Sequence, residues 1–217
     1  MNTSSLSAQP LGDSAVTISF GEVRSPQLLE RVHAAARAVA AANLEFVDDV
    51  VPAYLALTVF YDPRRSTYEE VVTRALDACG RADEARGRET ARRHVIPVTY
   101  DGIDLESVAA STGLSIEAIV ARHSEREYTV DILGFVPGFA YLSELDTSLH
   151  LPRRAQPRPR VPAGSVAIAA SQTAVYPLET PGGWHVIGTT TLAMFDPART
   201  PPALLAPGDS VRFEPAS

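Results

Sequence analysis

Residues 134–142 read GFVPGFAYL, and no other stretch constrains the second half of the chain as strongly. Proline and glycine, which form turns and interrupt helices, alternate here with aromatic and β-branched residues, which favour strands. Residues 159–165 (PRVPAGS) and 180–185 (TPGGWH) repeat this pattern. The composition predicts closely turned β-structure with ordered loops, and we expect the functional surface to lie in these loops.

The second half continues in the same character. Short apolar runs at residues 166–169, 186–187 and 211–213 are separated by Pro/Gly turns, as in a barrel or a sandwich. Before them, residues 104–112 and 115–123 predict two short helices that outline a helix-turn-helix. The second of these helices carries only one fixed cation on an acidic protein, so we expect it to pack as structure and not to bind DNA.

The first half predicts a small α/β domain. Residues 15–20 alternate as a half-buried strand does, and Ser25-Pro26 is a typical start of a helix. Two further β-prone runs, 46–51 and 54–61, precede a second helix that begins near Ser66 with a capping box. The order β-α-β-β-α needs one more strand to become the ferredoxin-like pattern.

The domain boundary is expected between these halves. Residues 81–93 are charged and carry almost no large apolar side chain, which is typical of a linker. Residues 94–100 return to β-character and can complete the first sheet or open the second domain. We favour the second domain.

Composition limits the possible partners. The chain has 217 residues, 45% of them hydrophobic, and a formal net charge of −7. No segment approaches the roughly 20 apolar residues that span a bilayer, and the first ten residues lack a secretory apolar run. We expect a cytoplasmic protein without nucleic acid or membrane as partner.

The reactive side chains narrow the chemistry further. The single cysteine, Cys79, predicts a buried thiol in a reducing compartment, and the five scattered histidines show no metal-ligand spacing, so we expect no metal site. All 19 basic side chains are arginine. Without lysine the chain cannot form a Walker A loop or a Schiff base, so ATP phosphates would have to meet arginine, backbone N–H groups, a metal or another chain.

The motifs at residues 134–142, 159–165 and 180–185, together with ASQTAVYP at 170–177 and FDP at 195–197, resemble one family. This family holds the B subunit of 5-oxoprolinase, allophanate hydrolase subunit 1 and a sporulation histidine kinase inhibitor. The resemblance runs from about Gly12 to Phe213.

The resemblance implies an α+β chain of two domains. Residues 1–90 would form a small ferredoxin-like α/β domain that ends in the charged linker, and residues 91–217 would form a cyclophilin-like β-barrel. It also implies the B subunit of an ATP-dependent 5-oxoprolinase that opens 5-oxoproline to L-glutamate. The chain would work with two partners, a larger C subunit plus a separate A subunit. It would bind a small amide or lactam substrate and be inactive alone, with ATP bound with or by the partners.

Eight residues in these motifs are candidates for contact with a substrate or a partner. Aromatic and turn residues that form a wall, a guanidinium, an amide, a hydroxyl and an imidazole suit a small amide-like ligand. His185 is also the candidate catalytic group. The eight are Phe135, Pro137, Phe139, Tyr141, Arg160, Gln172, Thr173 and His185. Each could instead be structural: the aromatic residues as barrel core, Gln172 and His185 as partners of buried backbone groups.

Three arginines near Arg160 receive the opposite interpretation. Arg153, Arg154 and Arg158 lie in a proline-punctuated stretch, and we expect them to be solvated.

Three positions depart from the pattern expected of the family. Ala170 and Ala174 stand where we expect glycine, and Thr189 stands where we expect arginine. The missing arginine removes an expected anion contact from this segment. It allows either a different substrate or a structural role for that arginine.

Two other functions remain open at this level. The chain could belong to an allophanate or urea-amide system as one of its subunits, or it could inhibit a histidine kinase purely by binding. Residue types do not separate these alternatives. Neighbouring reading frames and growth on 5-oxoproline or urea would.

The linker assignment makes a direct prediction. Limited digestion with trypsin should yield a C-terminal fragment that begins near Arg93, because residues 81–93 have too little apolar surface to be held by packing. Electrophoresis and mass spectrometry identify the fragment. First cuts within residues 153–160 would contradict the assignment.

Overall fold

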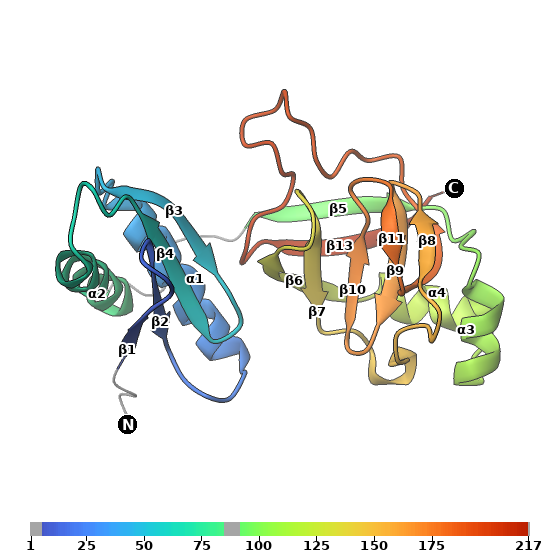
Figure 1. Ribbon diagram of the computed structural model, residues 1–217. Helices are drawn as coiled ribbons and strands as arrows, with labels where there is room; N and C mark the ends of the chain where they lie inside the picture. The colour runs from blue at the N-terminus through green and yellow to red at the C-terminus, as the bar shows by residue number, and fades with distance from the viewer. Residues whose placement is uncertain (1–5, 85–91, 217) are drawn as a thin grey trace. The chain divides into compact units, whose positions relative to one another are not determined.

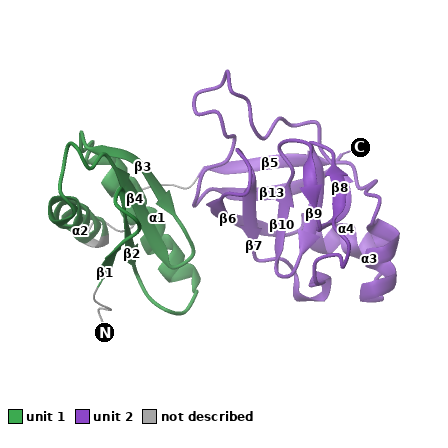
Figure 2. Ribbon diagram, in the orientation of Figure 1, with its two compact units in different colours: residues 1–90 green, residues 91–217 purple. Residues whose placement is uncertain are grey.

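We describe a computed structural model of the chain, covering residues 6–84 and 92–216. The chain divides into two compact units, Met1–Thr90 and Ala91–Ser217 (Figure 2). Most of the segment interpreted as a linker, residues 85–91, lies outside the described residues. In the described ranges, no helix is both long and apolar enough to cross a membrane.

Unit 1 combines a four-stranded sheet with two helices (Figure 1). The strands have the spatial order β1-β2-β4-β3 and all neighbours are antiparallel. In chain order the elements are β1 (Ser7–Pro10), β2 (Ala15–Ser19), α1 (Pro26–Ala41), β3 (Val47–Pro52), β4 (Ala56–Tyr61) and α2 (Tyr68–Glu84).

Local sequence accounts for most of unit 1. The Ser25 side chain accepts a hydrogen bond from Leu28 N at 3.1 Å, so α1 begins as predicted. Alternate residues of β2, including Val16 and Ile18, face the helices and form the core with the apolar sides of α1 and α2. Cys79 is buried in this core, as predicted.

The fourth strand of the sheet was not predicted. It is β1, which pairs with β2 and precedes the first helix. In the ferredoxin-like order the fourth strand follows the second helix, and unit 1 differs from that order. The reason is that the strand after α2, β5 (Arg93–Val98), pairs with a strand of unit 2.

Unit 2 is built on a seven-stranded sheet with the order β12-β9-β10-β7-β6-β13-β5. A separate ribbon pairs β11 with β8 (Figure 1). After β5 the elements are α3 (Leu105–Thr112), α4 (Ile116–Ser124), β6 (Glu127–Leu133), β7 (Ala140–Ser143), η1 (Thr147–Leu149), β8 (Arg158–Val161), β9 (Ser165–Ala169), β10 (Gln172–Val175), β11 (Thr180–Gly182), β12 (His185–Thr189) and β13 (Ser210–Pro215). Gly113 ends α3 and Ser115 caps α4, as predicted.

The large sheet curls into a nearly closed barrel. Its two end strands, β12 and β5, meet where Thr99 and Thr189 exchange backbone hydrogen bonds of 2.9 and 2.8 Å. Alternate residues of each strand fill the interior, for example Leu142 on β7 and Val175 on β10. The residues between them face outward and form a second apolar cluster on the outside of the wall.

A histidine lies fully buried inside the barrel core. His123 Nδ1 is 2.7 Å from the Tyr100 hydroxyl, and Nε2 is 2.9 Å from Thr173 Oγ1. Thr173 in turn donates to the carbonyl oxygen of Ala167 at 3.1 Å. Thr173 Oγ1 must therefore accept from Nε2–H, which leaves Nδ1 to accept from Tyr100. His123 is neutral in this arrangement.

This histidine makes the stability of unit 2 depend on pH. Burial lowers the pKa of His123 to about 3, whereas the unfolded chain titrates near 6.5. Between these values only the unfolded state takes up the proton, so stability is full above pH 6.5 and falls as the pH decreases, by at most about 1.4 kcal/mol per pH unit. His123→Gln should flatten the change between pH 7 and 5, measured by urea unfolding. An unchanged slope would contradict the assignment.

Candidate functional site

The outer face of the barrel wall carries an aromatic cluster above small residues. Phe139, Tyr141, Tyr176 and Trp184 pack edge to face, and the Phe139 ring centroid lies 4.9, 5.3 and 5.7 Å from those of Tyr141, Tyr176 and Trp184. The floor beneath them is formed by Ala167, Ala169 and Ala174 of β9 and β10. We call these seven residues the aromatic face.

The turn between β6 and β7 brings two predicted residues to one side of this face. Phe135 has a φ of +69° and a side chain that is 60% exposed, and its ring lies 5.4 Å from that of Phe139. Gly138 has a φ of +81°, and a Cβ there would lie 2.7 Å from Phe195 Cβ. Pro137 is exposed in the same turn. The turn holds an aromatic ring in solvent at the cost of backbone strain.

Polar groups adjoin the aromatic face on three neighbouring strands. Gln172 of β10 is half-buried, and its Nε2 donates to Asp131 Oδ2 at 3.2 Å. Ser143 of β7 donates to Asp131 Oδ1 at 2.6 Å. Since Thr173 pairs with Leu142, Gln172 and Ser143 are adjacent on the outer side of the wall, with Tyr141 next along β7. The structure thus brings Gln172 together with Tyr141 and Phe139.

Two other predicted residues are elsewhere. Thr173 points into the barrel, where its hydroxyl bonds to His123 and to Ala167 O. His185 pairs with Ile168, whereas Gln172 pairs with Ala169, so these two side chains belong to opposite sides of the wall. The expectation that His185 and Gln172 face one site therefore fails, because strand alternation separates them.

His185 is instead fastened to a loop. Its Nε2 donates to Pro152 O at 2.9 Å, so a neutral ring leaves Nδ1 as an acceptor. Nδ1 is buried and has no partner among the described residues.

A buried carboxylate that the sequence analysis missed organises one end of this region. Asp104 accepts from Arg154 Nη1 at 2.6 Å and from Arg158 Nη2 and Nη1 at 2.6 and 2.7 Å. Its Oδ2 also accepts from Val186 N at 2.8 Å. The prediction that Arg154 and Arg158 are solvated is wrong, because the fold brings Asp104 to them from 50 and 54 residues away. No local pattern marks such a pairing.

The ionisation of Asp104 reflects two opposing effects. Burial alone would raise the pKa of its carboxyl. The hydrogen bonds from Arg158 and Val186 N, with the charges of both arginines, outweigh burial and lower the pKa. Burial also raises the pKa of Tyr176 on the aromatic face, so this hydroxyl is protonated at neutral pH.

Arg160 and the remaining arginine lie on the surface. Arg160 is 3.7 Å from Glu179, with both side chains exposed, and such a pair contributes little to stability. Arg153 is exposed in the loop before the ribbon. The structure does not join Arg160 to Gln172 or to the aromatic rings by any contact among the described residues.

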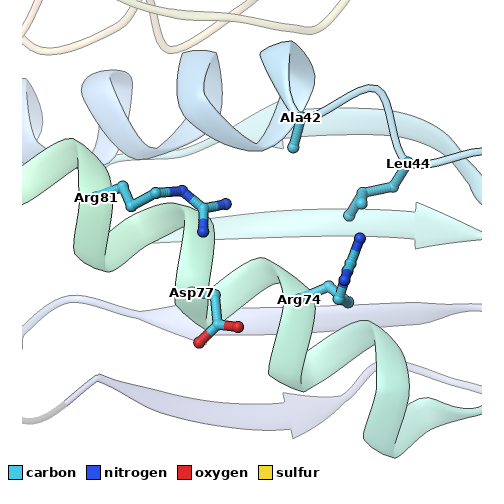
Figure 3. A pocket seen from close by; sticks show the side chains of 5 residues that line it. All are labelled: Ala42, Leu44, Arg74, Asp77 and Arg81. Atoms are coloured by element: carbon cyan, nitrogen blue, oxygen red, sulfur yellow. The ribbon is translucent and has the colours of Figure 1, made fainter.

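A hollow in unit 1 is a weaker candidate. It is lined by Ala42, Leu44, Arg74, Asp77 and Arg81, on α2 and the end of α1 (Figure 3). The two guanidiniums lie at the C-terminal end of α1, where the helix dipole is negative and disfavours a bound anion. Its charged side chains are exposed, and no aromatic side chain lines it. The outer face of the barrel is therefore the better candidate.

The chemistry available on the outer face is recognition. Aromatic rings can stack on a planar group, and the Gln172 amide can hydrogen-bond with it. Among the described residues, no group of His, Cys, Asp or Glu is placed to hold a metal ion. His123 is inside the barrel and His185 is on the other side of the wall, so neither of these imidazoles adjoins Gln172. The face is suited to bind and orient a small planar amide.

A family model described as the carboxyltransferase domain, subdomain C and D, matches residues 6–205, and the chain belongs to this family. Three relatives are named as the B subunit of 5-oxoprolinase, which confirms the family that the motifs indicated. The one from Bacillus subtilis (strain 168) is 42% identical over 223 residues, which cover 94% of this chain and 90% of the relative.

Two solved structures extend the comparison. The crystal structure of TTHA0988 is 44% identical with a TM-score of 0.83; the match covers 94% of this chain but 40% of that chain. This chain therefore spans less than half the length of TTHA0988. The K. lactis urea amidolyase is 14% identical with a TM-score of 0.73, covering 98% of this chain and 15% of that one, so it shares the fold.

The two alanines that stand in place of expected glycines differ in backbone conformation. Ala170 and Ser171 form the two-residue loop between β9 and β10, and Ala170 has a φ of +50°. A positive φ at the first loop position alone is typical of a type II′ turn, which prefers glycine there. Ala174 is a fully buried strand residue without positive φ.

These positions predict opposite effects of the same substitution. Ala170→Gly should raise the free energy of unfolding by about 0.5–1 kcal/mol, since it removes the strain of a left-handed Cβ. Ala174→Gly should lower it by about 1 kcal/mol or more, because it leaves a void beneath the aromatic rings and loosens a strand. Urea unfolding of both variants tests this. Destabilisation by Ala170→Gly would show that its backbone is not strained.

Proposed function

We propose that this chain is the B subunit of a 5-oxoprolinase complex, which opens the lactam of 5-oxoproline to L-glutamate with the use of ATP. Membership of the family and three relatives named as this component of 5-oxoprolinase support the proposal. The observation that carries it in the structure is the outer face, where Phe139 and Tyr141 adjoin the amide of Gln172. A lactam is a small planar amide of the kind that such a face would bind.

The active site is shared with other subunits in this proposal. Neither His123 nor His185 adjoins Gln172, and the sequence has no lysine and no phosphate-binding loop. ATP is therefore bound with or by the partner subunits, and the general base is supplied there. This chain contributes the surface that orients the lactam.

The proposed partners are a larger C subunit plus a separate A subunit. The letter in the names of the relatives implies further subunits for those proteins. In TTHA0988 the counterpart of this chain is 40% of a longer polypeptide, which supports a partner held close to it. The exposed ring of Phe135 suits such an interface, since aromatic anchors dominate binding energy. We further propose that unit 2 is a cyclophilin-like barrel and that the complex is cytoplasmic.

A second candidate is a role as one of the subunits of an allophanate or urea-amide system. The shared fold of the K. lactis urea amidolyase fits it, but a likeness at 14% identity does not extend to the substrate. Inhibition of a histidine kinase by binding is the third alternative. Both are outcomes of the experiment below.

The proposal predicts that the isolated chain has no measurable ATPase or ring-opening activity. Activity should appear when the chain is purified with its partner subunits and supplied with 5-oxoproline, because only then is the site complete. ATP hydrolysis and glutamate release measure this, with allophanate and buffer alone as comparison substrates.

The alternatives give different results in this assay. Turnover of allophanate and not 5-oxoproline would replace the proposed substrate. Robust turnover by the single chain would overturn the shared site. Binding to a histidine kinase without any turnover would favour inhibition by binding.

A further inference from the structure

Strand β6 contains a bulge at Asp131. Val130 pairs with Leu142 and Ile132 with Tyr141, so Asp131 is the extra residue that the bulge inserts into the strand. Its neighbour Val130 points into the barrel core. Asp131 is fully buried, and its carboxylate lies against Ser143 and Gln172 of the two neighbouring strands. Bulges often re-aim a side chain beside a functional site.

The two oxygens of this carboxylate have separate donors. Oδ1 accepts from the Ser143 hydroxyl at 2.6 Å, and Oδ2 accepts from Gln172 Nε2 at 3.2 Å. An ionised carboxylate has lone pairs and no proton, so it accepts hydrogen bonds only. The NH₂ end of the Gln172 amide must therefore face Asp131. A flipped amide would set two oxygens against each other in a buried place, at a cost of about 1–3 kcal/mol or more.

From this geometry we infer that Asp131 is a positioning residue that fixes the amide of Gln172 in one orientation. The carbonyl oxygen Oε1 is then held on the side away from Asp131, as a hydrogen-bond acceptor for a ligand. A site with an oriented acceptor selects ligands that carry an N–H group. The identity of that ligand as a lactam rests on the proposed function, whereas the orientation of the amide does not.

The inference can be tested by exchanging the two functional groups. Asp131→Asn keeps the shape but offers both a donor and an acceptor, so Gln172 is no longer held one way. Gln172→Glu alone sets two carboxylates together. The double variant Asp131→Asn/Gln172→Glu restores one hydrogen bond with reversed direction, and the second oxygen of Glu still accepts from a ligand. Glu127→Gln is the matched control, since it neutralises another carboxylate of β6 that is exposed and bonds to Ser210.

In the assembled complex with 5-oxoproline, Asp131→Asn should raise KM about tenfold with a smaller change in kcat. The double variant should recover most of this loss, and Gln172→Glu alone should be the weakest. Glu127→Gln should remain within about twofold of wild type. No recovery in the double variant, with all variants folded, would overturn the inference.

A second measurement needs no turnover. In the chain alone, ¹⁵N NMR of the Gln172 side-chain amide, assigned with Gln172→Ala, reports its hydrogen bond. Asp131→Asn should shift this resonance and increase its hydrogen exchange at least several-fold, while Glu127→Gln should not. An amide that is unchanged by Asp131→Asn would overturn the inference. Absence of 5-oxoproline turnover with an altered amide would overturn the proposed substrate and leave the positioning role standing.

Discussion

The buried carboxylate of Asp104 holds together the parts of unit 2 that the sheet does not connect. Its Oδ2 accepts from Val186 N, and its own N–H donates to Val186 O at 2.9 Å, so this residue covers the free edge of β12 as a neighbouring strand would. Gly102 permits this approach, since a Cβ there would lie 2.2 Å from the backbone of Ile187. The same carboxylate pairs with Arg154 and Arg158, which fastens the loop before β8 to the barrel.

The strand β12 that Asp104 covers also supports the outer face. Val186 and Trp184 belong to the apolar cluster outside the wall, and Phe139 packs against the Trp184 ring. Removing one member of a buried ion pair leaves an uncompensated charge, which is why such a cluster is costly to break. The position of the aromatic rings therefore depends on a contact that none of them makes.

The barrel wall divides the polar residues of the motifs into two groups. Thr173 faces inward to His123, which gives the interior a fully bonded polar chain, and its neighbour Gln172 faces outward to Asp131. One group stabilises the fold and the other adjoins a surface that can bind. The functional proposal rests on the outer group, and the resemblance to relatives named as a component of 5-oxoprolinase supplies the substrate.

Local signals predicted those parts of the molecule whose causes are local. The cap at Ser25, the helix end at Gly113 and the burial of Cys79 depend on neighbouring residues, and each is confirmed. The motifs also led to the family and to a candidate face with Phe139, Tyr141 and Gln172. The strand β1 was missed because a four-residue edge strand that ends in proline carries little pattern of its own.

The sequence by itself determined the β-character of the second half, the main helices and the family, because these follow from composition, periodicity and motif order. Tertiary structure alone decided which polar groups meet. Asp104 finds its arginines across about 50 residues, a bulge turns Asp131 toward Gln172, and strand register sends His185 to the other side of the wall. These pairings depend on how distant strands align, and a shift of one residue reverses which side a side chain faces.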